Sequence, residues 1–182
     1  ALPILFKRVA VKSLMSTLLA PVASDGATVN AIEHYYRRIS NLEFWTGDIF
    51  EANDKSEMVV VLTPRCDVAN DKSKYLLVCN VENAREDLPA NKDKRIKRLQ
   101  DMLTDNMLGK TVRYLPQTPL FDGGKVNLSS HRTISKEDFK RSFSIVITLS
   151  DDLANELLGK LAYSFLRTGI NTMNVDEYDA YL

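Results

Sequence analysis

The sequence has little of the residues that hold small or repetitive proteins together. It contains two cysteines, seven glycines and six prolines among 182 residues. These numbers exclude a disulfide scaffold, a self-contained four-cysteine zinc site and low-complexity character. No apolar run approaches the roughly 18 residues that a membrane-spanning helix needs. The 24 basic residues equal the 24 acidic ones, so no overall field attracts nucleic acid.

Cysteine usage and the first residues bear on compartment and context. Cys66 and Cys79 have no second pair beside them, so we expect two reduced thiols in a cytoplasmic protein. No basic-then-apolar segment ends in a small-residue cleavage site. The chain begins at Ala1 with an apolar stretch. We therefore expect a piece of a larger polypeptide and no membrane partner.

The pattern predicts three parts: an N-terminal helical segment over 1–42, an α+β body over 43–170 and an acidic tail over 171–182. Helical spacing of apolar residues indicates helices over 2–20 and 28–39, which would form a hairpin. The tail carries acidic and tyrosine residues and no basic residue. Such a terminal segment is typically ordered only against a partner.

Within the body, apolar runs predict strands joined by short turns. Strands are expected at 46–51, 58–62, 75–81, 112–115, 125–128, near 134 and at 143–149. The short link after the 58–62 run favours antiparallel pairing, because a parallel crossover needs about a dozen residues or more. Helices are expected over 90–108 and 151–168, and both would cover the sheet. The prediction is an α+β fold, with a small bent antiparallel sheet or half-open barrel.

The segment Thr63-Pro64-Arg65-Cys66-Asp67 is the first candidate site. It follows the most hydrophobic strand and has to leave the sheet, because Pro64 cannot donate to a central ladder. Polar side chains at such a rim often carry function. Arg65 suits a phosphate, Cys66 a nucleophile or metal ligand, and Asp67 a base. The alternative is a plain turn, with Asp67 accepting backbone N–H groups and Cys66 buried as a small hydrophobe.

Other chemistry-bearing residues are scattered. The cysteines with His34 and His131 lack metal-ligand spacing, so we expect no metal site and no cofactor. Basic residues crowd 92–98, including Lys94 and Arg98, and suit phosphate binding. Acidic residues on the same segment favour a solvated helix face instead.

Aromatic pairs stand on both sides of the junction between the helical start and the sheet. Tyr35-Tyr36 and Phe44-Trp45 suit stacking on a base or a partner. The alternative is that they seal the hairpin to the body.

Two segments resemble the MazF/PemK-like barrel family. Gly47-Asp48-Ile49, followed by Val59 to Pro64, is similar to the family's G-D-I strand and its V-V-L-S/T strand. The resemblance implies a small SH3-like barrel that dimerises and acts as a sequence-selective RNA-cleaving toxin. The family has Arg-Pro immediately before the apolar strand, with that Arg helping catalysis. Lys55-Ser56-Glu57-Met58 stands there in this chain, so the resemblance supports the barrel-like sheet more than the activity.

A second resemblance covers the wider pattern. The L-T-P-x-C-D segment, Tyr114-Leu115-Pro116 and the final Leu166-Arg167-Thr168-Gly169 look like uncharacterised bacterial proteins. Those proteins are C-terminal modules of signalling or phage-defence polypeptides.

Three functions follow as hypotheses. The favoured one is a non-enzymatic interaction or sensor module of a larger bacterial signalling or phage-defence protein. It would bind a protein partner or a fused domain through the rim around Arg65, Cys66 and Asp67, with His131 as a further candidate.

The first alternative is a MazF/PemK-like endoribonuclease toxin. In that hypothesis Thr63 and Arg65 handle the scissile phosphate, and Asp67 or His131 carries the proton. The second alternative is a nucleic-acid-binding module that uses Lys94 and Arg98. All three hypotheses are compatible with a homo-oligomer.

Overall fold

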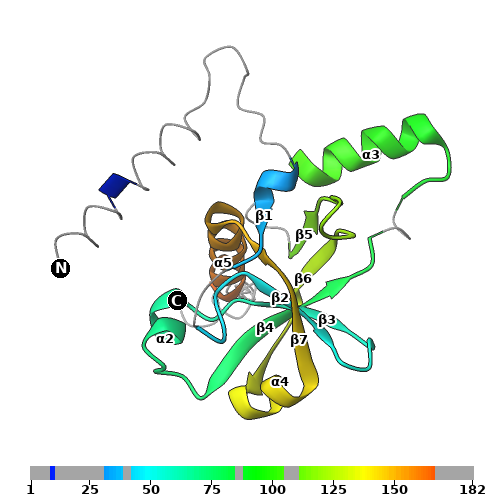
Figure 1. Cartoon of the computed structure of the whole chain (residues 1–182). Coiled ribbons are helices and arrows are strands. Elements are labelled where there is room, and N and C mark those ends of the chain that lie inside the picture. The colour runs from blue at the N-terminus through cyan, green and yellow to red at the C-terminus, as the bar shows by residue number, and fades with distance from the viewer. Residues whose placement is uncertain (1–8, 11–30, 39–41, 85–87, 105–110, 167–182) are drawn as a thin grey trace, which may run out of the picture. The chain divides into compact units, whose positions relative to one another are not determined.

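A computed structural model of the chain describes residues 9–10, 31–38, 42–84, 88–104 and 111–166 (Figure 1). The chain divides into two units, residues 1–30 and 31–182. The predicted 2–20 helix lies outside the described residues except for Val9 and Ala10, which are helical, and the acidic tail lies outside them entirely. The elements are η1 (Ala31–His34), β1 (Tyr35–Tyr36), β2 (Asp48–Ala52), β3 (Met58–Val61), α2 (Arg65–Ala69), β4 (Tyr75–Glu82), α3 (Lys92–Thr104), β5 (Val112–Leu115), β6 (Gly124–Ser135), α4 (Lys136–Ser142), β7 (Phe143–Leu149) and α5 (Asp151–Phe165).

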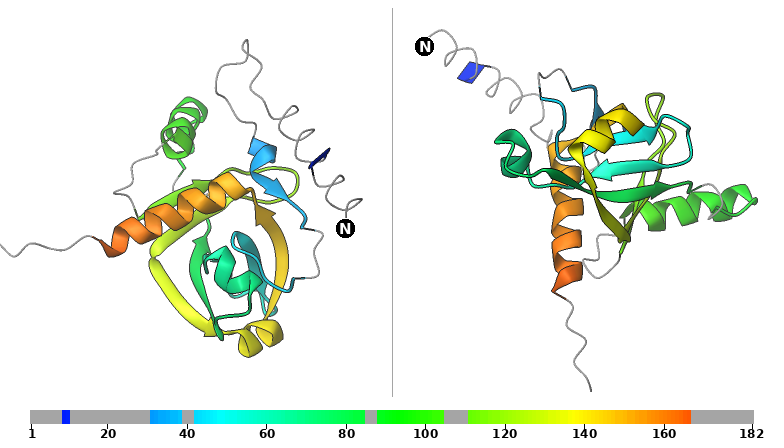
Figure 2. Two further views of the ribbon diagram at one scale, coloured as in Figure 1. Left: turned by 90° about the vertical axis from the view of Figure 1, so that its left-hand side faces the viewer. Right: turned by 90° about the horizontal axis from the view of Figure 1, so that it is seen from below.

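A single seven-stranded sheet forms the centre, in the order β1-β7-β2-β3-β4-β6-β5. Every neighbouring pair is antiparallel, and the sheet curls on itself (Figure 2). The prediction of an α+β fold with a bent antiparallel sheet or half-open barrel is confirmed. The predicted pairing of the two apolar strands is also confirmed, with Val60 of β3 opposite Cys79 of β4.

The apolar run of β3 serves two cores, because successive side chains of a strand point to opposite faces. Val60 and Leu62 belong to a core that also contains buried residues of α5. Val59 and Val61 belong to a second core, which contains Phe139 of α4. A strand buried on both faces needs a continuous apolar sequence rather than an alternating one, which explains the unbroken valine run.

Helix α5 follows the prediction closely. The Ser150 hydroxyl accepts a hydrogen bond from the Leu153 backbone N–H and caps the helix, and Leu153, Leu157 and Leu161 are buried. Helix α3 also forms within the predicted range, but it does not cover the sheet. All of its described side chains, over 92–101, are exposed. No helix among the described residues is long and apolar enough to cross a membrane.

The predicted 28–39 helix is a 3-10 turn and a short strand over 31–36. Tertiary contacts account for the difference. The Tyr35 ring packs 5.2 Å from the Phe121 ring, centroid to centroid, and its hydroxyl donates to the Pro116 carbonyl at 2.8 Å. Strand β1 pairs with β7 through Tyr35 opposite Leu149. Sheet pairing and burial outweigh the local helical spacing here.

Candidate functional site

Helix α2 carries three of the residues singled out in the sequence. Pro64 precedes it with φ −53°, and the Pro64 carbonyl accepts the backbone N–H groups of Asp67 and Val68 at 3.0 and 3.1 Å. Val68 is buried and anchors the helix on the second core. The chain therefore leaves the sheet after β3 as predicted, but as a short helix rather than as an open loop.

Arg65 links α2 to two distant parts of the chain. Its Nη2 lies 2.8 Å from Asp151 Oδ1, at the start of α5, and its guanidinium carbon lies 5.8 Å from the centroid of the Trp45 ring. The Nε atom is buried and has no hydrogen-bond partner in the described part of the chain. The structure thus brings Arg65 of the first candidate site together with Trp45 of an aromatic pair, which the sequence analysis had treated separately.

A second arginine–carboxylate pair underlies this region. Arg38 Nη2 lies 2.9 Å from Asp48 Oδ2, and the Thr148 hydroxyl donates to Asp48 Oδ1 at 2.8 Å. Asp48 is fully buried. Burial raises the pKa of its carboxyl, although the hydrogen bonds from Arg38 and Thr148 oppose that shift.

Tyr36 lies in the field of both pairs. Burial is the main cause that raises the pKa of its phenol. The nearby carboxylates Asp151 and Asp48 add to the shift, and the two arginines oppose it. Tyr36 is 37% exposed, so its ring is open to a ligand. We call the surface formed by Tyr36, Trp45, Arg65, Cys66 and Asp67 the α2 rim.

Cys66 and Asp67 complete the α2 rim. Cys66 is exposed, and its thiol lies 3.6 Å from Asp67 Oδ1. The alternative interpretation of this segment placed Cys66 inside the protein, and the structure places it at the surface. Cys79, the other thiol, is buried, as its place within a strand predicted.

Thr63 lies inside the fold. It is 4% exposed, and its hydroxyl accepts the Leu77 backbone N–H at 2.7 Å. Its carbonyl accepts the Thr46 hydroxyl at 2.5 Å. Thr63 therefore joins the end of β3 to β4 and to the segment before β2.

His131 belongs to an irregular stretch of β6. The β4–β6 pairing passes from Arg132 opposite Val78 to Asn127 opposite Asn80, so four residues of β6 face one residue of β4. His131 Nδ1 lies 3.0 Å from the Leu128 carbonyl, and its ring packs 4.9 Å from the Phe165 ring. Among the described residues, no hydrogen bond or ion pair joins His131 to the α2 rim.

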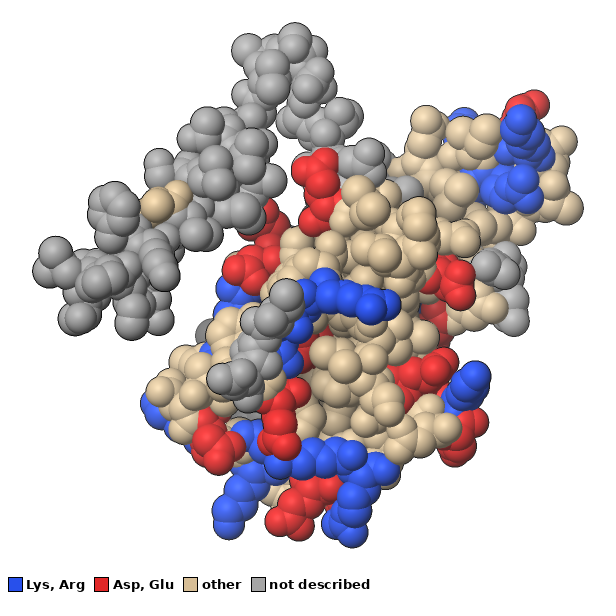
Figure 3. Space-filling view, in the orientation of Figure 1, with Lys and Arg blue, Asp and Glu red and all other residues tan. Residues whose placement is uncertain are grey.

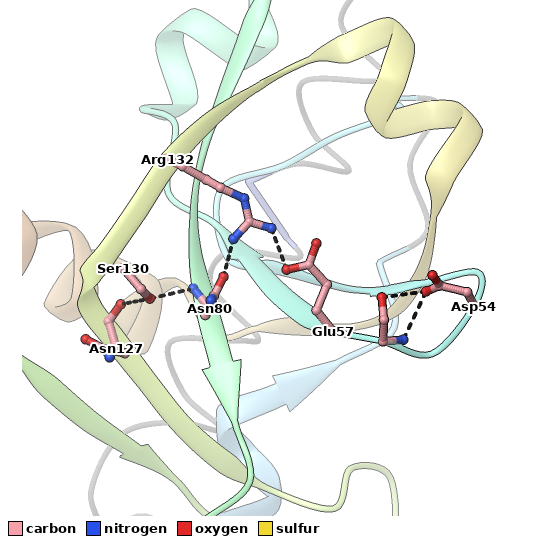
Figure 4. Close-up of polar contacts among 7 residues, drawn as sticks. Asp54, Glu57, Asn80, Asn127, Ser130 and Arg132 are labelled. Atoms are coloured by element: carbon pink, nitrogen blue, oxygen red, sulfur yellow. Dashed lines mark hydrogen bonds and ion pairs between the residues drawn. The ribbon is translucent and has the colours of Figure 1, made fainter.

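A polar network around Arg132 was missed by sequence reasoning (Figure 4). Arg132 Nη2 lies 2.6 Å from Glu57 Oε2, and Nη1 donates to Asn80 Oδ1. The Asn80 backbone N–H donates to the Ser130 hydroxyl at 3.3 Å. Glu57 and Asn80 also line a cavity of about 400 Å³. Arg132 and Glu57 are 75 residues apart in the chain, so no local motif could have joined them.

A larger cavity, of about 810 Å³, lies beside α2. Val68 and Ala69 of α2 line it, together with Lys136 and Lys140 of α4. Lys136 pairs with Asp71 and Lys140 with Glu43, both at 2.5 Å. The cavity therefore combines apolar surface with two lysine–carboxylate pairs.

The remaining predicted residues lie apart from this region. Lys94 and Arg98 are exposed on α3, which lies on a different side of the molecule from α2 (Figures 1 and 2). Among the described residues, no group of three or more His, Cys, Asp or Glu side chains is arranged to hold a metal ion.

No protein-family model and no curated protein matches this sequence. Solved structures of MazE–MazF from Deinococcus radiodurans are similar to it. The form I structure is 18% identical with a TM-score of 0.44, and the match covers 71% of this chain and 100% of that one. The form III structure is 16% identical with a TM-score of 0.44, and the match covers 69% and 98%. The weak MazF-like resemblance predicted from the sequence is confirmed at this level of similarity.

Proposed function

We propose that the chain is a non-enzymatic interaction module that binds an acidic segment of a protein partner at the α2 rim. The observation on which the proposal rests is the Arg65 guanidinium, which stands over Trp45 and contacts the exposed Asp151 through its carboxylate and its carbonyl oxygen. The second sequence resemblance supports a place in a larger bacterial signalling or phage-defence protein.

The Arg65–Asp151 ion pair is one in which a carboxylate of a partner could replace Asp151. The two side chains are 28% and 62% exposed, and ion pairs at such positions contribute only about 0–1 kcal/mol. A carboxylate from a partner can therefore replace Asp151 at low cost. Arginine binds carboxylates through two parallel hydrogen bonds, and the Trp45 face adds a cation–π contact.

The positions of the catalytic candidates support a non-enzymatic role. General acid–base catalysis needs the reacting groups within hydrogen-bond reach of one another or of the substrate. The Thr63 hydroxyl is engaged by the Leu77 backbone inside the protein, and His131 packs against Phe165 on another part of the fold. Arg65 and Asp67 remain at the surface, where they suit recognition.

Trp45 provides a direct test, because it is the chain's one tryptophan. We expect its fluorescence to change when a glutamate-rich peptide is titrated, and Arg65→Ala to abolish the change. Arg141→Ala is the matched control, since Arg141 is 72% exposed and lies on α4. An equal response in wild type and Arg65→Ala would refute binding at the α2 rim.

The Arg132 network supports the ribonuclease as a second candidate. The MazF/PemK-like resemblance calls for an arginine just before the apolar strand, and Arg132 reaches Glu57 at that place from β6. Fragment sizing of a mixed RNA pool without added metal tests it. RNA cleavage that Arg132→Ala abolishes, while the fold remains intact, would replace the interaction module by an enzyme. Intact RNA would exclude the ribonuclease hypothesis.

The exposure of α3 supports nucleic-acid binding as a third candidate. Phosphate contacts through Lys94 and Arg98 would make affinity fall steeply with salt. The double variant Lys94→Glu/Arg98→Glu would then weaken binding of a duplex or single-stranded RNA. Affinity that is independent of salt would exclude this candidate.

A further inference from the structure

The cavity of about 810 Å³ beside α2 lies outside the site proposed above. None of the residues that define the α2 rim is among the described residues that line it. Its walls come from three parts of the chain: the segment before β2, the stretch from α2 to the start of β4, and the end of β6 with α4. Cavities of roughly 300–1,000 Å³ are typical of sites for small ligands.

Charges of both signs surround this cavity. Basic and acidic side chains intermingle at the end of the molecule where α2 and α4 lie (Figure 3). The described charged residues that line the cavity are Lys74, Lys136, Lys140, Glu43, Asp71 and Glu137. The two signs differ in depth, however. The Lys136 side chain is 15% exposed, whereas that of its partner Asp71 is 87% exposed. In the second pair, Lys140 is again less exposed than Glu43. The inner side of the cavity is therefore cationic.

Backbone contacts fix the position of Lys136. It is the first residue of α4, and its backbone N–H donates to the Lys74 carbonyl at 3.0 Å. Ser135, which precedes it, lies opposite Tyr75 in the β4–β6 ladder. The strand pairing thus brings Lys136 and Tyr75 to the same wall of the cavity.

Aromatic and aliphatic surface accompanies this cation. Tyr75 is 56% exposed and Leu42 is 39% exposed, and both line the cavity. Phe44 and Val68 also line it, and both belong to the second core. An exposed tyrosine ring beside a lysine suits a ligand that has an aromatic ring and an anionic group.

Asp71 occupies the place that the anion of such a ligand would take. It lies on the exposed turn after α2, with φ 50°. The hydrogen bond from Lys136 lowers the pKa of its carboxyl, so the group stays ionised at neutral pH. An ion pair with so exposed a carboxylate contributes little to stability. An incoming anion can therefore displace Asp71 from Lys136.

We propose that this cavity binds a small aromatic molecule that carries a phosphate or carboxylate group. The anion lies on Lys136 in place of Asp71, and the ring packs against Tyr75. The site is separate from the α2 rim, so it does not depend on the binding of an acidic partner there.

Calorimetric titration of the full chain with phenyl phosphate tests this site, because that probe has both features. Inorganic phosphate and phenol carry one feature each. We expect phenyl phosphate to bind at least about tenfold more tightly than either fragment, since two contacts in one molecule reinforce each other. Benzoate is titrated in parallel, and its affinity relative to phenyl phosphate decides between a carboxylate and a phosphate ligand.

Two variants of the Lys136–Asp71 pair should act in opposite directions. Lys136→Gln should weaken binding of the tighter probe by about tenfold or more, because a hydrogen bond from a charged group is lost. Asp71→Asn should strengthen binding by about threefold, because the competing carboxylate is removed. A pair with only a structural role would shift the affinity in the same direction in both variants.

Tyr75→Ala tests the ring contact and should reduce the affinity for phenyl phosphate toward that of inorganic phosphate. Lys72→Gln is the matched control for Lys136→Gln, because it removes the same charge. Lys72 is exposed and is not among the residues that line the cavity, so binding should be unchanged. Circular dichroism of each variant checks that the fold is intact.

Three results would overturn the proposal. If neither phenyl phosphate nor benzoate bound the wild-type chain at millimolar concentration, the cavity would not be a site for this class of ligand. Equal losses of affinity in Lys136→Gln and Lys72→Gln would show a general effect of charge. Unchanged or weaker binding in Asp71→Asn would show that Asp71 does not compete with the anion.

Discussion

Helices α3 and α5 share periodic leucines and a side-chain cap, but they differ in composition and in surroundings: five of the thirteen residues of α3 are basic, whereas α5 is largely apolar. Each carries leucines at i, i+4 or i, i+3 spacing, and each has a side-chain cap. The Asn91 side chain accepts the Asp93 and Lys94 backbone N–H groups, and Ser150 caps α5. Yet Leu157 of α5 is fully buried, whereas Leu99 of α3 is 36% exposed.

The two helices also differ in what precedes them. Strand β7 ends at Leu149 and α5 begins at Asp151. This one-residue link keeps α5 next to the sheet, where its apolar face is buried. Nine residues separate the end of β4 at Glu82 from the start of α3 at Lys92, so the link that precedes α3 is much longer. Periodicity thus predicts both helices, whereas burial of the apolar face goes with the more apolar composition of α5 and with its short connection to β7.

Truncating a leucine in each helix tests this comparison most strongly. Leu157→Ala should lower the free energy of unfolding by about 2–5 kcal/mol, because it leaves a cavity in the first core. Leu99→Ala should change it by less than about 0.5 kcal/mol, as exposed substitutions do. Urea denaturation, with the slope m checked for constancy, measures both. A loss of more than about 2 kcal/mol in Leu99→Ala would place α3 against the folded body.

Removing the caps should give a smaller contrast. Ser150→Ala should cost about 1 kcal/mol of global stability, since an N-cap side chain satisfies a helix N–H group. Asn91→Ala should leave the urea midpoint unchanged, because α3 stands apart from the cores. Far-ultraviolet circular dichroism of Asn91→Ala should nevertheless show lost helicity. Equal shifts in the two midpoints would mean that the helices unfold as one unit.

The rate of thiol labelling should show the smallest of these effects, because it reports how well α5 shields Cys79 in the first core. Cys79 lies in the core that α5 covers, and burial raises the pKa of its thiol to about 12. At pH 8 we expect a thiol reagent to label Cys66 rapidly and Cys79 only when the core opens. Leu157→Ala should speed the labelling of Cys79, and Leu99→Ala should not.

Faster labelling of Cys79 in Leu99→Ala would contradict the separation of α3 from the first core. Labelling of both thiols at equal rates in the wild-type protein would show that Cys79 is open in the native state. Either result would remove the contrast between the two helices.

Local sequence predicted much of the sheet. The β-branched run at 58–62 predicted β3, and the run at 143–149 predicted β7 with its bounds. Pro64 predicted the exit from the sheet, for a reason that depends only on its missing N–H group. These features rest on interactions within a few residues, which a single sequence displays.

The candidate site was harder to predict, because its contacts join distant residues. Arg65 and the Asp151 carbonyl that it also contacts are 86 residues apart, and Arg132 and Glu57 are 75 apart. The segment of Arg65 was singled out in the sequence, but its contact with Trp45 follows from the antiparallel pairing of β2 with β3, in which the Thr46 hydroxyl donates to the Thr63 carbonyl. Thr63 looked equally available in the sequence, and the β3–β4 pairing placed its hydroxyl inside.

The sequence by itself determined which stretches are apolar enough to form strands, where a proline or a capping serine interrupts them, and how charge is distributed along the chain. Only the tertiary structure decided which periodic helix is buried, that Tyr35 and Tyr36 form a strand, and which arginine meets which carboxylate. The physical reason is that propensity and capping act over a few residues. Burial and ion pairing depend on which surfaces the curled sheet brings together.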